Sequence, residues 1–291
     1  MVIDCKKLAE EVKADVKRRV ETYTDVWGEC PKLAVVTSGR DEAGKVYVNN
    51  KKKACEEVGI GFELVKTFDM CDAVRKVNAL NCDEKVHAVI VQLPCFGTDK
   101  DDRVTEVIHE FKDVDGLCVE NVGGLHCNDA MSFVPATANG VLKIIQSVDK
   151  PNSHKNVVIV GRSMLVGRPL AELLLQYDYT VTVCHSKTKN LAEHTKRADI
   201  VVMATGVPKM LTADMVKEGS IVIDVGINRD KNGKLCGDVD FENVSKVAGY
   251  ITPVPGGVGL LTVACLLENV ITAAENQKYL KKSVDTGNDM W

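Results

Sequence analysis

Tyr47 and Lys51 are four residues apart in a segment with helical spacing, and together they could move a proton. Side chains at that separation share one face of a helix. A lysine in a pocket loses hydration, which favours its neutral form and lets it exchange a proton near neutral pH. Considered alone, the pair fits better with a tyrosine that covers the edge of the core and a lysine on the surface.

Gln92 and Asp115 are two further candidates. Gln92 ends a predicted strand, and ligands of open α/β sheets bind beyond the carboxyl ends of the strands. Asp115 lies beside Gly116 in an irregular stretch, where its carboxylate could accept two N–H groups from a basic nitrogen heterocycle. By itself, such an aspartate is more often a turn residue.

The β-branched run Val157–Val160, the glycine Gly161 and the helical spacing from Gly167 predict a strand, a tight turn and a helix. The free amides and the dipole at such a helix start favour a dinucleotide pyrophosphate. The full Gly-x-Gly-x-x-Gly spacing is absent, so an ordinary strand-to-helix turn stays open as the alternative. Arg162 and Ser163 favour the cofactor, because they place a cation and a hydroxyl in the turn.

The end of the next predicted strand distinguishes two nicotinamide cofactors. An NAD-specific protein often has Asp or Glu there, which binds the ribose hydroxyls. Here the sequence is Cys184-His185-Ser186-Lys187, without an acid. Because Ser186 and Arg162 could bind a ribose phosphate instead, the sequence favours NADP over NAD.

Two glycine-containing loops differ in how well their sequences suit anion binding. The segment Pro255-Gly256-Gly257-Val258-Gly259 exposes backbone amides before a long helix, although a plain helix-start loop is the alternative. Gly39 to Val46 has the spacing of a nucleoside-triphosphate loop. There Val46 replaces the Ser or Thr that would hold Mg²⁺, and Asp41 and Glu42 would repel phosphate. We therefore expect no triphosphate in that second loop.

These candidates must be positioned by alternating strands and helices. The first part of the chain predicts helix 4–23, strand 33–37, helix 42–58, strand 62–65, helix 71–80, strand 87–92, helix 101–111 and a loop-like stretch at 112–125. The second part predicts helix 139–148, linker 149–154, strand 157–160, helix 167–175, strand 180–184, helix 190–196, strand 199–203, helix 212–217, strand 220–225, a hairpin at 232–233 and a long helix, opened by residues 252–259, that runs to about 275. The alternation is typical of doubly wound parallel sheets.

The pattern predicts two doubly wound α/β domains. The first comprises residues 1–140 and a returning C-terminal segment, 270–291, and the second is a Rossmann-type NADP-binding domain at 141–269. The length of 291 residues is enough for both.

Composition excludes several other classes of protein. A net charge of −4 gives no general attraction to nucleic acid or to an anionic membrane, and no apolar run approaches the length of a membrane span. The eleven cysteines have no Cys-x-x-Cys spacing and the six histidines no His-Glu-x-x-His, so no metal site is expected. The scattered cysteines and a helix that begins at once after Met1 point to the cytoplasm.

Six segments together resemble the bifunctional methylenetetrahydrofolate dehydrogenase/methenyltetrahydrofolate cyclohydrolase family. They occur in the family's order across nearly the whole chain: Tyr47-Val-Asn-Asn-Lys51-Lys-Lys-Ala-Cys, Val91-Gln92-Leu93-Pro94, Lys112-Asp-Val-Asp115-Gly, Val160-Gly-Arg-Ser163-Met-Leu-Val-Gly-Arg-Pro169, Asp224-Val-Gly-Ile227-Asn and Thr252-Pro-Val-Pro-Gly-Gly-Val-Gly259. Each segment is modest alone, but their order is highly specific.

The resemblance implies a homodimer in which two α/β domains flank an active-site cleft. It implies oxidation of 5,10-methylenetetrahydrofolate to the 5,10-methenyl form with NADP⁺, then hydrolysis to 10-formyltetrahydrofolate, a one-carbon donor for purine biosynthesis. Hydride transfer mainly requires two rings to be positioned, so no acid–base residue is demanded for that step.

The matching motifs also assign roles to residues. Lys51 would be the main catalytic residue of the hydrolytic step, Tyr47 would flank the pterin, Gln92 would tune Lys51 and Asp115 would anchor the amino-pyrimidine. The rest of the substrate side would be Val91, Leu93, Pro255, Gly256, Gly257, Val258 and Gly259, and the cofactor side would be Gly161, Arg162, Ser163, Ser186 and Ile227.

The chain departs from the family pattern in three places. Asp41-Glu-Ala-Gly44 replaces Asp-Pro-Ala-Ser, Pro135-Ala-Thr-Ala-Asn-Gly140 replaces Pro-Cys-Thr-Pro-x-Gly, and Leu260-Leu261 replaces Pro-Met. None of them removes Lys51, Gln92 or Asp115. The alternatives are a dehydrogenase without cyclohydrolase activity, an NADP-dependent reductase of shikimate or amino-acid type, and a non-enzymatic folate-binding protein.

Overall fold

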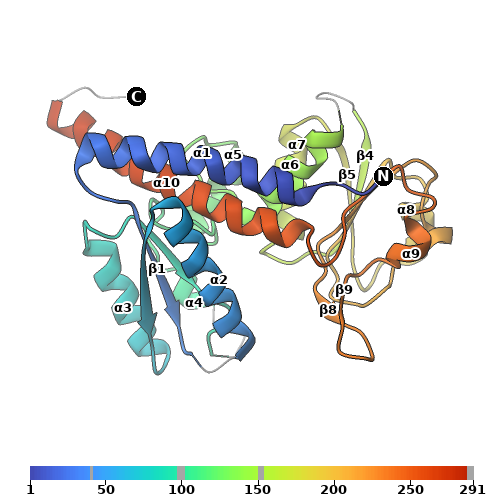
Figure 1. The fold of residues 1–291 in the computed structure, drawn as a ribbon, viewed down its shortest axis with the longest axis horizontal. Helices are drawn as coiled ribbons and strands as arrows, with labels where there is room; N and C mark the ends of the chain where they lie inside the picture. Colours follow the sequence, from blue (N-terminus) through green and yellow to red (C-terminus); the bar gives the residue numbers. More distant parts are fainter. Residues whose placement is uncertain (40–41, 97–101, 150–153, 287–291) are drawn as a thin grey trace. The chain divides into compact units, whose positions relative to one another are not determined.

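The computed structural model describes residues 1–39, 42–96, 102–149 and 154–286 (Figure 1). Parts of the predicted linker 149–154 and of the Gly39–Val46 loop, and the predicted helix start at Asp101, lie outside these ranges. The chain forms two compact units. We call them the Gly161 unit (Met1–Glu10 and Pro135–Cys265) and the Lys51 unit (Glu11–Val134 and Leu266–Trp291).

The limits of these units differ from the predicted limits of 140 and 270. Met1–Glu10 belongs to the Gly161 unit because its backbone extends that unit's sheet. Ile3 N donates to Ile251 O at 2.9 Å, and Ile251 N donates to Met1 O at 3.0 Å. Such pairing to a distant strand leaves no local signal in the sequence.

The Lys51 unit contains a parallel three-stranded sheet in the order β2-β1-β3. Its strands are β1 (Lys32–Thr37), β2 (Gly61–Lys66) and β3 (Ala88–Val91), and its helices include α2 (Glu42–Val58), α3 (Met70–Cys82) and most of α1 (Cys5–Trp27). Val36 and Val89 on the sheet share a buried core with Val77 and Leu80 of α3. This core fixes the strand ends from which the candidate residues project.

Two predictions in this unit are wrong. The predicted helix 101–111 is only α4 (Asp102–Thr105), followed by turns, and the predicted loop 112–125 contains α5 (Val119–Cys127). The sequence did not predict α5 because it contains Gly123 and Gly124, and glycine has a low helix propensity. A Cβ at Gly124 would lie 1.7 Å from Ser132 Oγ, so close packing explains the glycine there.

The Gly161 unit contains a parallel five-stranded sheet in the order β10-β7-β6-β4-β5. The strands are β4 (Asn156–Val160), β5 (Thr180–Cys184), β6 (Ile200–Met203), β7 (Ile221–Asp224) and β10 (Tyr250–Ile251). Its helices are α6 (Ala136–Val148), α7 (Gly167–Gln176), α8 (Leu191–Thr195) and α9 (Phe241–Val244). The prediction of two α/β domains with parallel sheets is confirmed.

The smaller elements of the Gly161 unit agree only in part with those predicted from the sequence. The hairpin is confirmed as β8 (Asn228–Arg229) paired antiparallel with β9 (Leu235–Cys236). The predicted helix 212–217 is a short 3₁₀ turn, Ala213–Met215. Thr212 Oγ1 donates to Asp214 Oδ1 at 2.6 Å, and such local side-chain bonds compete with α-helix formation.

The last helix, α10 (Val258–Thr286), is longer than predicted. Within the described ranges it alone has the length and apolar composition of a membrane-crossing helix, over Val258–Lys282. Because 61% of its most apolar window is buried inside the protein, it also has the character of a core helix, which passes the same test.

Candidate active site

Helix α2 and the end of β3 bring Lys51 and Gln92 together. Lys51 Nζ donates to Gln92 Oε1 at 2.9 Å. Gln92 N donates to Val36 O at 2.8 Å, which continues the pairing of β3 with β1 beyond the strand end. Gln92 Nε2 donates to Leu93 O at 3.1 Å, so the amide presents its oxygen to the lysine. The ammonium is therefore held at the carboxyl end of the sheet.

Burial and charge tune Lys51 and Asp115 as a pair. Burial lowers the pKa of Lys51, and the negative charge of Asp115 opposes that shift. Burial raises the pKa of Asp115, and the positive charge of Lys51 opposes it. A lysine whose pKa is lowered holds a larger neutral fraction near neutral pH, which suits it to accept and return a proton.

The loop that carries Asp115 is fixed by a neighbouring aspartate that sequence reasoning missed. Asp113 is fully buried. Its Oδ2 accepts three hydrogen bonds, from Leu117 N at 2.7 Å, Cys118 N at 2.8 Å and Asn121 Nδ2 at 3.1 Å. These donors lie just after Asp115, so Asp113 fixes the backbone that follows it. The only signal in the sequence was the position of Asp113 in the same short motif.

Asn269 on α10 is a second residue that sequence reasoning missed. Its Nδ2 donates to Val114 O and to Val134 O, each at 2.9 Å. Val114 directly precedes Asp115, so α10 fixes the loop from its other side. The backbone that carries Asp115 is thus held by Asp113 and by Asn269 of α10.

The other predicted substrate residues of the Lys51 unit differ in their exposure to solvent. Tyr47 is 45% exposed on α2, one turn before Lys51, so its ring can contact a ligand. Val91 packs in the buried core, which leaves only its backbone for a ligand. Leu93 is half-buried just beyond β3.

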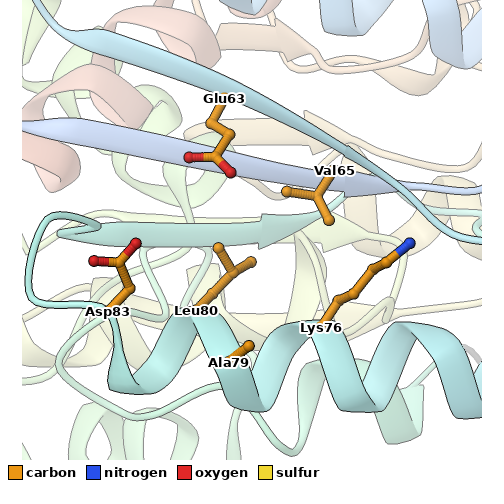
Figure 2. Close-up of a pocket in the computed structure, with 6 residues that line it drawn as sticks. All are labelled: Glu63, Val65, Lys76, Ala79, Leu80 and Asp83. Carbon is orange, nitrogen blue, oxygen red and sulfur yellow. The ribbon is translucent and has the colours of Figure 1, made fainter.

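A separate surface pocket of about 290 Å³ lies between β2 and α3 (Figure 2). It is lined by Glu63, Val65, Lys76, Ala79, Leu80 and Asp83. None of the predicted site residues lines it, and Lys76 is already paired with Asp72 Oδ2 at 2.9 Å. We assign no ligand to this pocket.

The Gly161 turn fits a dinucleotide by its close packing. Gly161 has a φ of +138°, and a Cβ there would lie 2.3 Å from Ala204 O. A Cβ at Gly167 would lie 2.1 Å from Gly161 O. The two glycines therefore let the backbone fold tightly before α7, whose N-terminal amides and dipole favour an anion. Arg162 and Ser163 are exposed in the turn, where they can contact a ligand.

The remaining cofactor candidates gather at the same edge of the sheet. Ser186 is exposed in the turn after β5, and Ile227 is 53% exposed between β7 and β8. Gly161, Ser186 and Ile227 thus follow β4, β5 and β7 of one parallel sheet. The carboxyl ends of parallel strands share one edge, where ligands of such sheets bind.

The segment Pro255–Gly259 lies beyond β10 in the Gly161 unit. Pro255, Gly256 and Gly259 are exposed, but Val258 is buried and contributes no side chain to a ligand. A Cβ at Gly257 would lie 2.2 Å from Pro253 O, so only glycine fits this turn. Across the described residues, no group of three His, Cys, Asp or Glu side chains is arranged to hold a metal ion.

Two sequence models match the chain. Residues 3–115 match "Tetrahydrofolate dehydrogenase/cyclohydrolase, catalytic domain", and residues 135–278 match the NAD(P)-binding domain of the same family. The chain belongs to the tetrahydrofolate dehydrogenase/cyclohydrolase family. The resemblance found in the six sequence motifs is thereby confirmed.

Named members of this family are similar over nearly their full length. The bifunctional protein FolD of Nitrosospira multiformis is 48% identical over 277 residues, which cover 94% of this chain and 96% of that protein. The crystal structure of the bifunctional FolD of Campylobacter jejuni has a TM-score of 0.91 and 42% identity, with 95% of this chain and 99% of that chain covered.

A third relative was solved with ligands. It is the methylenetetrahydrofolate dehydrogenase-cyclohydrolase of Trypanosoma brucei, complexed with NADP cofactor and inhibitor. It has a TM-score of 0.89 and 34% identity, with 95% of this chain and 98% of that chain covered. Because both halves of the chain match models of the folate family, a reductase of shikimate or amino-acid type is not supported.

Proposed function

We propose that this chain oxidises 5,10-methylenetetrahydrofolate to 5,10-methenyltetrahydrofolate with NADP⁺ and then hydrolyses the product to 10-formyltetrahydrofolate. The observation that carries the proposal is the 2.9 Å hydrogen bond from Lys51 to Gln92, beside the charge of Asp115. This arrangement suits a proton-transfer step, and it occurs in a chain that also has an NAD(P)-binding domain.

Lys51 serves the hydrolytic step. The oxygen of a water molecule bonds to the methenyl carbon, and its proton passes to the neutral amine of Lys51. The bond from that carbon to the pterin nitrogen N5 then breaks while the remaining hydroxyl proton leaves to solvent and the C=O bond forms. Lys51 returns its proton to N5, which leaves the formyl group on N10. Gln92 keeps the amine in place, and the burial that lowers the pKa of Lys51 makes the neutral amine available.

The proposed roles of the neighbouring residues follow from their placement. Asp115 accepts hydrogen bonds from the amino-pyrimidine of the substrate, and Tyr47 covers the pterin ring. Bound NADP⁺ supplies the hydride acceptor for the oxidation. Gly161 and Ser163 would hold its pyrophosphate, and Arg162 and Ser186 would bind its ribose phosphate. The NADP complex of the Trypanosoma brucei relative supports the choice of cofactor.

One coupled assay tests both activities. The purified chain is supplied with methylenetetrahydrofolate and either NADP⁺ or NAD⁺, and reduced cofactor and methenyl absorbance are followed together. The proposal predicts faster reduction of NADP⁺, followed by methenyl decay above the uncatalysed rate. Methenyl accumulation without catalysed decay would leave only the dehydrogenase, and no cofactor reduction would reject the proposed function.

We also propose that the protein is a homodimer joined through β5. This strand is at the end of the five-stranded sheet, so one of its backbone edges has no partner strand within the sheet. Exposed apolar side chains accompany it, namely Val183 at 39%, Leu175 at 54% and Tyr177 at 45% exposure. A bare strand edge with apolar neighbours favours pairing with a second copy.

Sedimentation velocity tests the dimer. Val183→Lys should shift the protein towards the monomer, because a charge would be buried between copies. Val122→Lys is the matched control, since Val122 on α5 is also 39% exposed but lies in the Lys51 unit. A monomeric wild-type protein would reject this part of the proposal.

The cellular setting is a further proposal. The cysteine spacing fits a reducing compartment, and we propose that the enzyme acts in the cytoplasm, where its formyl product supplies purine biosynthesis. Cell fractionation, and purine auxotrophy on deletion of the gene, test the location and the supply separately.

A further inference from the structure

Two buried aspartates lie at the carboxyl end of the sheet in the Gly161 unit. Asp224 ends β7 and Asp238 follows β9, with exposures of 3% and 0%. Asp238 Oδ2 accepts from Thr205 N at 2.6 Å, Thr205 Oγ1 at 2.9 Å and Gly206 N at 3.1 Å. Asp238 Oδ1 accepts from Asn228 Nδ2 at 2.7 Å. One carboxylate thus joins the loop after β6 to the first residue of β8.

Asp224 fixes the backbone of its neighbour. Its Oδ1 accepts from Gly226 N at 3.0 Å and from Asp238 N at 2.9 Å, and its Oδ2 accepts from Val239 N at 2.9 Å. The position of the Asp238 carboxylate is therefore set by a second carboxylate rather than by a flexible loop.

Two glycines make room for these contacts. A Cβ at Gly226 would lie 2.1 Å from Asp238 Oδ1, and a Cβ at Gly237 would lie 1.8 Å from Asp224 Oδ2. Any side chain at either position would displace a carboxylate. The arrangement of the two aspartates and the two glycines is therefore specific.

The segments joined by Asp238 border the proposed dinucleotide site on two sides. Ala204, directly before Thr205, is the residue against which Gly161 packs. Ile227 is the exposed residue between Gly226 and Asn228. Asp224 accepts a hydrogen bond from the backbone of Gly226, and Asp238 accepts one from the side chain of Asn228. A shift of Asp238 would therefore change the distance between the phosphate turn and Ile227.

We propose that Asp238 is a positioning residue for NADP, which holds the Thr205–Gly206 loop and the Ile227 segment at the separation that the bound cofactor requires. This inference rests on the proposed function. Asp238 is fully buried, so it would act through the two segments and not by direct contact with the cofactor. Its removal would leave the partly buried donors Thr205 N, Thr205 Oγ1 and Asn228 Nδ2 without their acceptor, and the segments would move apart.

The first test measures NADPH binding by titration calorimetry. Asp238→Ala should raise the dissociation constant at least about tenfold, because hydrogen bonds to a charged group are lost. Asp240→Ala is the matched control. Asp240 is two residues away, and its side chain bonds Asn243 Nδ2 within its own segment, so the dissociation constant should stay within about twofold of wild type.

A charge swap separates positioning from general stability. Asn228→Asp places two carboxylates against each other and should also weaken NADPH binding about tenfold. Adding Asp238→Asn restores one donor and one acceptor, and should return binding to within about threefold of wild type. Hydrolysis of methenyltetrahydrofolate, which needs no nicotinamide, should persist in each folded variant.

The outcomes distinguish the two proposals. If the wild-type protein binds no NADPH, the proposed function fails before the inference is reached. If it binds NADPH and Asp238→Ala binds equally well, the inference is overturned. If Asp238→Ala does not fold, NADPH binding by Asn228→Asp and by the double variant Asn228→Asp/Asp238→Asn tests the inference instead. The inference is overturned if the second substitution does not restore NADPH binding, or if the rate of hydrolysis falls in parallel with binding.

Discussion

Asp115 in the Lys51 unit is half-buried and Asp238 in the Gly161 unit is fully buried, and the two aspartates differ in their hydrogen-bond partners. The carboxylate of Asp238 accepts four hydrogen bonds from its own unit. Within the described residues, the carboxylate of Asp115 accepts none, and the charge with the largest effect on its pKa is that of Lys51. The fold uses the bonding capacity of Asp238, whereas that of Asp115 stays unfilled among the described residues, as its proposed contact with the substrate requires.

Lys51 and Lys112 show the same difference for lysine. Lys112 Nζ donates to Leu80 O at 2.9 Å and to Asp83 O at 2.8 Å, so its ammonium stabilises the fold. Lys51 Nζ donates to the single side chain Gln92. Removing a polar group from water without filling its hydrogen-bonding capacity costs folding free energy. Such groups are typical of sites that bind a ligand or catalyse a reaction.

The largest expected effect concerns Lys51. Lys51→Met should lower the rate of methenyl hydrolysis about 10²- to 10⁴-fold, because it removes the proton acceptor. Folate binding should remain, since Asp115 and Tyr47 are intact. The decay of methenyl absorbance in the purified variant measures the change. Lys52→Met is the control, because Lys52 is exposed and pairs only loosely with Glu56 at 3.8 Å. Unchanged hydrolysis in Lys51→Met would refute the assigned role.

Asp115→Asn should raise the Michaelis constant for the folate about 10- to 100-fold in both reactions, because a charged hydrogen-bond acceptor is lost. Binding of NADPH should not change, which is the opposite of the result expected for Asp238→Ala. Steady-state kinetics and calorimetry on the two variants test the contrast directly. Equal effects on folate and NADPH in both variants would remove the distinction between the two aspartates.

We also expect Asp115→Asn to change the pH dependence of the hydrolysis rate. The charge of Asp115 raises the pKa of Lys51, so its loss should let that pKa fall further. Hydrolysis requires neutral Lys51, and its rate should therefore begin to rise at a lower pH in the variant than in wild type. A pH–rate profile of hydrolysis at saturating folate measures the shift. A shift to higher pH would contradict the role of Lys51 as a base.

Arg162→Ala should raise the Michaelis constant for NADP⁺ about tenfold and leave that for NAD⁺ nearly unchanged, because only NADP⁺ carries the ribose phosphate. Arg168→Ala, which alters an exposed arginine on α7, is a comparison in the same unit. Initial rates with both cofactors give the result. Equal increases for the two cofactors would count against the phosphate assignment.

The smallest effect is on the stability of the Lys51 unit. His87 is 2% exposed, its Nδ1 accepts from Lys32 N at 3.1 Å, and burial lowers its pKa despite the nearby Glu29. The unfolded chain binds a proton below about pH 6.5 while the folded unit does not, so stability should be lost as the pH falls below that value. The slope is at most about 1.4 kcal/mol per pH unit for one proton.

Urea unfolding between pH 7.5 and 5.5 measures that slope. His87→Gln should unfold at lower urea at pH 7.5 but show a smaller loss on acidification, because the titrating group is gone. If the wild-type and variant slopes agree, another group must account for the acid sensitivity of the protein.

Local spacing in the sequence determined much of this protein. The helix 42–58 and the strand 180–184 were predicted with the bounds that the structure shows, because each shows its own period of apolar residues. The spacing of Tyr47 and Lys51, and the β-branched strand before Gly161, likewise depend on residues close together in the chain. The six ordered motifs were enough to indicate the family.

Tertiary structure alone decided which polar groups the fold uses and which it leaves for a ligand. Asn269 Nδ2 reaches Val114 O across 155 positions of sequence, and Thr205 N reaches Asp238 across 33. A long separation in sequence also hid the pairing of Met1 with Ile251 in the sheet. The contact that requires Gly124 in α5 is with the nearby Ser132, but it too forms only when the chain folds. An aspartate has the same chemistry wherever it occurs. Its role follows from the donors that folding brings to it, and these are not its neighbours in the chain.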